Sequence, residues 1–299
     1  MASKAAVQGC PKCAGCSDAK TKLRELQQWR QDADVAEAAY KRPPPKTIDA
    51  PKDQVEPPPP IGPMELVDSP DALDEAGLTP GDLTIPGTNF GAVVYKSGAP
   101  PRYTVSFRGT EQWLGSVMGA NKAQGLGDAK TPYYSRAQEI ARKMEIKEMS
   151  RGGAATGGSA KFVGHSLGGG LASAAAVAAD GDATTFNAAG LHKNTIAAGG
   201  RTGGKVTAVR VRGEALTGLQ ESSPLPNAYG NRKVSLDPPF NLTRDALAQG
   251  LGSALLGLPG LGAAEALRSG LLHKMGNVTD SLDMAIGTAK ADVKTHCGG

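Results

Sequence analysis

Ser166 stands in a G-x-S-x-G pattern, residues 164–168, between a short apolar run and an alanine-rich segment. Where this pattern joins a strand to a helix, the serine lies on a sharp turn that presents its hydroxyl above the end of the sheet. The N-terminus of the following helix points at the turn, and the Leu167 amide can stabilise a developing oxyanion. The pattern therefore predicts a serine nucleophile, and the alternative is a glycine-rich corner with a structural role only.

A serine nucleophile needs a base, and the sequence contains four histidines: His165, His192, His273 and His296. His165 adjoins the serine on the turn, so the two side chains should diverge. His192 comes too early for the chain order nucleophile, acid, base, and His296 falls in a predicted tail. His273 follows the last predicted sheet segment and is the expected base, although any single histidine can instead be structural.

The acid that orients the base should follow a strand between the nucleophile and the base. Glu214 stands just past the predicted strand 206–212, and Asp237 stands just past a second apolar run, 233–236. Both carboxylates serve in this role in hydrolases. Glu214 is the preferred candidate and Asp237 the alternative acid. A purely local role for Glu214, as a helix cap or a partner of Arg212, stays open.

The elements around these residues alternate between strand and helix. Two strands, 92–95 and 103–107, are expected to pair across the turn-rich segment 97–101. Strands separated by helices imply a mainly parallel sheet covered on both faces, and therefore an α/β fold. The remaining predicted strands are 161–163, 184–187 and 206–211, and the predicted helices are 133–144 and 167–179.

The domain organisation is predicted from a proline-rich segment, residues 42–63, which holds nine prolines. Proline fixes the backbone and lacks an N–H donor, so this segment is expected to be an extended linker. Before it, residues 1–41 form a cysteine-containing appendage whose part from Ser17 to Lys41 has apolar residues at helical spacing. After it, residues 64–299 form the main domain.

The four cysteines are Cys10, Cys13, Cys16 and Cys297. The C-x2-C-x2-C spacing lacks the fourth cysteine of a ferredoxin-type cluster, and a zinc site would need a ligand from the C-terminus. We expect a small disulfide or free thiols on a mobile tail, and no metal.

Composition excludes other classes of function. Lys and Arg number 33 against 29 Asp and Glu, and aromatic residues make up 4% of the 299 residues. This mild charge excess and the scarcity of aromatic residues argue against a nucleic-acid partner. The first residues lack the apolar region of a Sec signal. The uncharged segment 246–264 contains five glycines and a proline, so we expect a flexible or surface-seeking segment rather than a transmembrane helix.

Several motifs together resemble the class 3 lipases, which are α/β-hydrolases that act on glycerolipids. The resemblance covers residues near 90 to 275 and includes a Leu-Pro segment after the Glu214 strand. The motifs, in the order seen in that family, are Phe107-Arg108-Gly109-Thr110, Trp113-Leu114, Gly164-His165-Ser166-Leu167-Gly168-Gly169 and Phe186-Asn187-Ala188-Ala189-Gly190.

The resemblance implies a role for each matching residue and no metal or organic cofactor. Ser166 matches the nucleophile, His273 matches the base by position, and Thr110 matches the residue that completes the oxyanion hole with the Leu167 amide. The family acid is usually aspartate, whereas this sequence has Glu214. The family lid is expected in residues 112–130 or in the glycine-rich segment 241–264. The apolar part of the second segment, residues 251–261, could insert into a lipid surface, or could be an ordinary buried helix pair.

The layout of appendage, linker and lipase domain is similar to that of bacterial antibacterial lipase effectors, which machines such as the type VI secretion system deliver. This similarity implies synthesis in the bacterial cytoplasm, secretion without a Sec signal, and action at the membrane or periplasm of a target cell. It also implies a phospholipid membrane surface as substrate, a secretion carrier and a cognate immunity protein.

Two other functions stay open. One is a soluble esterase, thioesterase or acyltransferase on the same fold, and the other is a non-catalytic, secretion-linked binding module.

Overall fold

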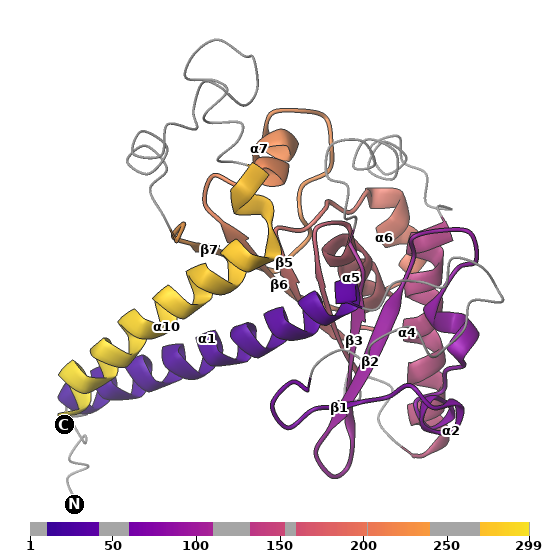
Figure 1. The fold of residues 1–299 in the computed structure, drawn as a ribbon, viewed down its shortest axis with the longest axis horizontal. Helices are drawn as coiled ribbons and strands as arrows, with labels where there is room; N and C mark the ends of the chain where they lie inside the picture. The colour runs from indigo at the N-terminus through magenta and orange to yellow at the C-terminus, as the bar shows by residue number, and fades with distance from the viewer. Residues whose placement is uncertain are drawn as a thin grey trace, which may run out of the picture.

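The computed structural model of the protein describes residues 11–41, 60–109, 132–152, 160–201, 203–239 and 270–298. In these ranges, seven strands form one sheet, in which the spatial order of the strands equals their order along the chain (Figure 1). The strands are β1 (Glu65–Leu66), β2 (Ala92–Ser97), β3 (Arg102–Phe107), β4 (Ala160–His165), β5 (Asp182–Phe186), β6 (Lys205–Val211) and β7 (Arg232–Leu236).

The sheet is antiparallel at one edge and parallel elsewhere. β1 pairs with β2 and β2 with β3 in antiparallel register, and the expected pairing of the strands around 92–95 and 103–107 is confirmed. From β3 to β7 every neighbouring pair is parallel. Because β4, β5 and β6 run in the same direction, their carboxyl ends lie at one edge of the sheet. The predicted α/β fold is confirmed.

One face of the sheet is covered by helices that connect the strands. α4 (Pro132–Ser150) lies between β3 and β4, and α5 (Leu167–Ala178) lies between β4 and β5. α5 is built almost wholly from glycine, alanine and other small residues, so it packs closely and is buried along its length. Shorter helices complete the fold: α2 (Pro70–Glu75), a 3-10 turn η2 (Pro80–Leu83), α6 (Lys193–Gly199) and α7 (Ala215–Glu221).

The opposite face is covered by the first and last helices, α1 (Pro11–Lys41) and α10 (Met275–Cys297). Side chains alternate across β4, so that Phe162 packs on the α4 and α5 side while Val163 packs among residues of α1. Towards β6 and β7, apolar residues of both terminal helices share one cluster: Leu26, Trp29, Ala33, Val278 and Leu282 pack with Phe186, Val209 and Val211.

The two terminal helices lie side by side and antiparallel (Figure 1), and a disulfide joins Cys16 to Cys297 across 281 positions of sequence. The expectation of a mobile cysteine tail is wrong for these two residues, because both lie on packed helices. His296 was expected in a tail as well, but it lies in the last turn of α10. The side chains of Cys10 and Cys13 lie outside the described residues.

Polar contacts also fix α1 on the sheet. The Asp32 carboxylate is buried and forms an ion pair with Lys161 of β4. Arg232 of β7 donates two hydrogen bonds of 2.9 Å to Glu25 and lies over the ring of Trp29. The predicted appendage helix therefore forms part of the layer over the sheet, while domain boundaries at residues 41 and 63 stay predictions.

The described ranges contain neither a candidate membrane span nor a candidate metal cluster. No helix in these ranges is long and apolar enough to cross a membrane. No cluster of three His, Cys, Asp or Glu side chains in them could hold a metal ion. The uncharged segment 246–264 lies outside the described residues.

The disulfide leads to a prediction about stability. A cross-link that closes so long a loop restricts the unfolded chain, so we expect its loss to lower the free energy of unfolding by about 2–4 kcal/mol. Wild-type protein and a Cys16→Ser/Cys297→Ser variant should be melted with and without dithiothreitol. Reductant should lower the melting temperature of the wild type to that of the variant and leave the variant unchanged. An equal effect of reductant on both proteins would contradict this role.

Candidate active site

Ser166 lies on the turn between β4 and α5 with a backbone conformation that L-residues rarely adopt, φ 58° and ψ −125°. Its carbonyl oxygen accepts hydrogen bonds from the amides of Gly169 and Ala189, which hold the turn in place. The two flanking glycines are required by packing. A Cβ at Gly164 would collide with the backbone of Gly168, and a Cβ at Gly168 would collide with the backbone at the end of β3.

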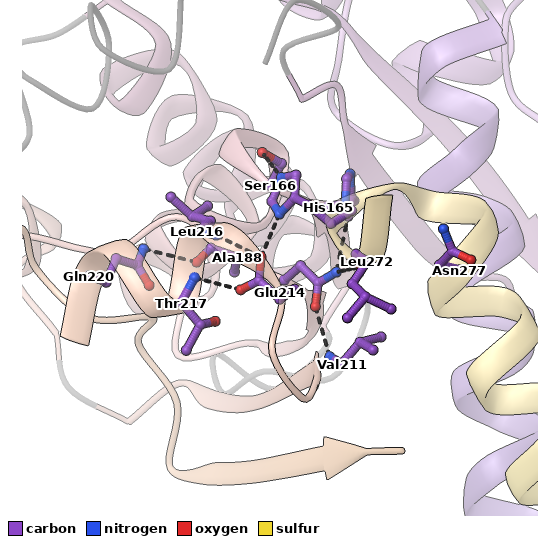
Figure 2. A network of polar contacts seen from close by, with 12 residues as sticks. His165, Ser166, Ala188, Val211, Glu214, Leu216, Thr217, Gln220, Leu272 and Asn277 are labelled. Carbon is purple, nitrogen blue, oxygen red and sulfur yellow. Dashed lines mark hydrogen bonds and ion pairs between the residues drawn. The ribbon is translucent and has the colours of Figure 1, made fainter. Parts of the chain in front are cut away.

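His273 lies between Ser166 and Glu214 and contacts both. Its Nε2 is 2.9 Å from the Ser166 Oγ, and its Nδ1 is 2.7 Å from the Glu214 Oε2. All three residues are buried, and the exposed fractions of Ser166 and Glu214 are both 1%. Figure 2 shows the polar network in which Ser166 and Glu214 lie. The structure thus brings His273 into contact with Glu214, 59 positions earlier in the chain, and with Ser166, 107 positions earlier.

Glu214 is both the cap of a helix and the partner of His273. Its carboxylate accepts hydrogen bonds from the amides of Leu216, at 2.8 Å, and Thr217, at 2.6 Å, at the start of α7 (Figure 2). Burial alone would raise the pKa of the Glu214 carboxyl, but the hydrogen bonds from His273 and Thr217 outweigh it and lower that pKa. Glu214 is therefore a carboxylate at neutral pH, and its position is fixed by α7.

The alternative acid is not brought to the site. The Asp237 side chain is 61% exposed and forms an ion pair with Arg212. Arg212, which the sequence suggested as a local partner of Glu214, thus pairs with Asp237 instead.

The partners of His273 determine where its proton lies. An ionised Glu214 only accepts hydrogen bonds, so the His273 Nδ1 carries hydrogen and donates it. The Nε2 of the neutral ring is then an acceptor for the Ser166 hydroxyl. This tautomer has the bare nitrogen beside the serine, as a general base requires.

Asn187 lies at the end of β5, between the strands that carry Ser166 and Glu214, and its role was missed by the sequence analysis. It is buried, has a left-handed φ of 43°, and its Nδ2 donates to the carbonyl oxygens of Leu272, at 3.1 Å, and His273, at 3.3 Å. Its Oδ1 accepts from the Val211 amide at 2.9 Å. The side chain therefore ties the histidine segment to the end of β6. Its place in the Phe186–Gly190 motif, directly after a predicted strand, was the available signal.

His165 contacts the base through the backbone rather than through the serine. Its Nε2 lies 2.6 Å from the His273 carbonyl oxygen, and the centroids of the two imidazole rings are 4.9 Å apart. Burial, followed by the nearby His273, lowers the pKa of His165 to about 3. His165 is therefore neutral at physiological pH.

The other predicted residues fall in different places. His192 caps α6, where its Nδ1 accepts a hydrogen bond from the Asn194 amide at 3.1 Å. Leu167 is the first residue of α5, as expected for an amide directed at the turn. Thr110 lies outside the described residues, as do both candidate lid segments, 112–130 and 241–264.

Comparisons with known proteins identify the family of this chain. The family model described as "Phospholipase-like: Tle-like phospholipase domain" matches residues 31–272. The chain is also 33% identical over 173 residues to a protein named extracellular phospholipase A1 from Serratia liquefaciens, an alignment that covers 54% of this chain. The chain spans about half the length of this curated relative, 49%. The predicted membership of a lipase or phospholipase family is confirmed.

The two candidate acids can be separated by mutation. Glu214→Gln keeps the side-chain shape, but its amide can donate to His273 and favour the wrong tautomer, so we expect kcat to fall by about 10³–10⁴-fold. Asp237→Asn should leave kcat within about twofold, because the Asp237 side chain is exposed and paired with Arg212. Initial rates of ester hydrolysis for both variants test this assignment. A larger loss in Asp237→Asn than in Glu214→Gln would overturn it.

The pKa of His165 predicts a pH dependence of stability. Below pH 6.5 the unfolded chain protonates this histidine, whereas the folded protein keeps it neutral down to about pH 3. Because the unfolded state binds the additional proton, the contribution of His165 should lower the free energy of unfolding by roughly 1.4 kcal/mol per pH unit below 6.5. Urea unfolding of wild type and His165→Gln between pH 6.5 and 4.5 should show a steeper decline for the wild type. Equal slopes would contradict a buried, neutral His165.

Proposed function

The chain belongs to the family of Tle-like phospholipase domains, and we propose that it hydrolyses acyl esters of membrane glycerophospholipids with Ser166 as nucleophile, His273 as base and Glu214 as acid. One observation carries this proposal: the continuous chain of hydrogen bonds from the Ser166 Oγ through the two nitrogens of His273 to the Glu214 carboxylate. A nucleophile, a base and an orienting acid in this arrangement form the machinery of acyl transfer.

In the first half of the reaction, the Ser166 Oγ attacks the ester carbonyl carbon while its proton passes to the His273 Nε2. Glu214 stabilises the imidazolium that forms and keeps the ring oriented. The tetrahedral intermediate then collapses, its bond to the leaving oxygen breaks, and that oxygen takes the proton from His273. The products of this half are an acyl-enzyme on Ser166 and a lysophospholipid.

In the second half, a water molecule loses a proton to the His273 Nε2 and attacks the acyl carbon. Collapse of this second intermediate breaks the bond to the Ser166 Oγ, which regains a proton from His273. A free fatty acid leaves and the starting enzyme is restored. We propose that the Leu167 amide, at the N-terminus of α5, and Thr110 stabilise the oxyanion in both halves.

The relative and the surface support a phospholipid substrate. The Serratia protein is named a phospholipase A1, which favours cleavage of the ester at the first glycerol position. Leu219 is an exposed apolar side chain on α7, the helix that Glu214 caps, so this helix offers an apolar contact to lipid. The net charge of +4 favours approach to an anionic lipid surface.

The biological setting is part of the same proposal. Secretion is supported by the word "extracellular" in the name of the Serratia relative. Delivery as an antibacterial effector, with a secretion carrier and an immunity protein, rests on the layout of the sequence and is consistent with the name of the matched family. Its target would be the phospholipid of a neighbouring cell's membrane.

The proposed activity is tested with vesicles of phosphatidylethanolamine and phosphatidylglycerol that carry distinguishable acyl chains at the two glycerol positions. Wild-type protein should release mainly the chain at the first position, and Ser166→Ala should release at least about 10³-fold less. Because Ser166 is buried, we expect a higher rate on vesicles than on a monomeric short-chain ester.

The other outcomes separate the alternative functions. Equal rates on monomeric and aggregated substrate would favour a soluble esterase. Equal release by wild type and Ser166→Ala would exclude Ser166 as the nucleophile. Absence of hydrolysis with a folded wild type would favour the binding-module hypothesis.

A further inference from the structure

The last turn of α1 reaches the residue next to the proposed nucleophile. The Tyr40 hydroxyl oxygen lies 2.8 Å from the His165 Nδ1 and 3.4 Å from the His165 carbonyl oxygen. The two rings are tilted by 58°, with their centroids 5.9 Å apart. A residue near the start of the chain therefore contacts the turn between β4 and α5 directly.

The space for this hydroxyl is provided by a glycine. Gly109 follows β3 in the Phe-Arg-Gly-Thr motif, and a Cβ at this position would collide with the Tyr40 hydroxyl. The same Cβ would lie 2.6 Å from the His165 carbonyl oxygen. Gly109 therefore leaves a space between the ends of β3 and β4, and the Tyr40 hydroxyl fills it.

The direction of each hydrogen bond follows from the chemistry of the acceptors. The His273 carbonyl oxygen can only accept, so the His165 Nε2 carries hydrogen and donates it across 2.6 Å. A neutral His165 then has a bare Nδ1, which accepts the hydroxyl proton of Tyr40. The hydroxyl has one hydrogen, and the shorter contact to Nδ1 takes it.

We propose that Tyr40 and His165 are positioning residues for His273, the base of the function proposed above on which this inference rests. Tyr40 fixes the His165 tautomer, and His165 holds the His273 carbonyl oxygen, which Asn187 also contacts at 3.3 Å. These contacts fix the backbone of the base so that its Nε2 meets the Ser166 Oγ.

A neutral partner suits this position. When His273 accepts the serine proton, a positive charge forms on a ring whose centroid lies 4.9 Å from that of His165. A second cation there would oppose this charge. The Tyr40 hydroxyl donates to the Nδ1, so it stabilises the neutral form of His165 and leaves the site with one cation during catalysis.

The other contacts of α1 make this arrangement rigid. Asp32 lies eight positions before Tyr40 and forms its ion pair with Lys161, on the strand that ends at His165. Val35, Ala38 and Ala39 of α1 pack on Val163 of the same strand. The helix is therefore held against β4 along its last turns, and the Tyr40 hydroxyl has little freedom to leave His165.

The test compares two variants, each of which lacks one tyrosine hydroxyl. Tyr40→Phe removes the donor to His165 and keeps the ring. Tyr103→Phe is the matched control, since its hydroxyl is buried on β3 and finds no hydrogen-bond partner among the described residues. We expect Tyr40→Phe to lower kcat on p-nitrophenyl butyrate at least about tenfold with KM within about twofold, because a displaced base slows the chemical step and not binding. Tyr103→Phe should match the wild type.

Two further measurements keep the result specific. Labelling of Ser166 by a fluorophosphonate should slow in Tyr40→Phe in parallel with kcat. His165→Gln, which retains an N–H donor for the His273 carbonyl oxygen, should keep more activity than His165→Leu at a similar melting temperature.

A wild-type kcat and labelling rate in Tyr40→Phe would overturn the inference, and so would an equal loss in Tyr103→Phe. A failure of the proposed function is distinguishable from this. If wild-type protein released no fatty acid from vesicles but Ser166 still labelled, the proposed substrate would be wrong, and the labelling rates would still decide the role of Tyr40.

Discussion

The site depends on one constraint, which is that the His273 ring must reach Ser166 and Glu214 at the same time. The serine and the glutamate follow β4 and β6, which are separated in the sheet by β5. The contacts of 2.9 Å and 2.7 Å to the two ring nitrogens leave little freedom for the histidine. Asn187, at the end of the intervening β5, bridges the end of β6 and the histidine segment. The three neighbouring strands therefore each contribute to placing one imidazole.

The same geometry determines the charges. Glu214 stays ionised in a buried place because α7 and His273 supply its hydrogen bonds. His165 stays neutral because burial and the neighbouring ring disfavour its charged form. The His273 imidazole is thus paired with the Glu214 carboxylate, whereas the His165 imidazole is paired with a tyrosine hydroxyl and a carbonyl oxygen. This difference in partners, rather than in residue type, distinguishes the proposed base from its neighbour.

Much of this arrangement was readable from local sequence. The strand and helix around Ser166, and the position of Glu214 after a strand, follow from short-range patterns that backbone sterics and burial impose. His273 was selected by chain order and elimination. α10 was missed although Val278, Leu282 and Ile286 have helical spacing, so a usable signal existed there.

The contacts between distant parts of the chain had no such signal. Tyr40 lies within the first predicted helix, residues 17–41, but nothing in its neighbours indicates that its hydroxyl reaches His165. The Cys16–Cys297 disulfide likewise depends on how α1 and α10 meet, which is a tertiary property. Expecting Cys16 and Cys297 on a mobile tail was wrong for this reason.

The most direct test of the proposed acid and base is to detect the proton on the His273 Nδ1. Its position follows from the contacts of His273 with Glu214 and Ser166. In protein labelled with ¹⁵N-histidine, we expect a strongly deshielded, nitrogen-coupled proton resonance at neutral pH. It should persist in Ser166→Ala and disappear in His273→Gln. It should also be lost in Glu214→Gln, where the carboxylate is gone and the amide favours the other tautomer. Absence of this resonance from the wild type, or its persistence unchanged in Glu214→Gln, would contradict the assignment of Glu214 and His273 as the acid and base.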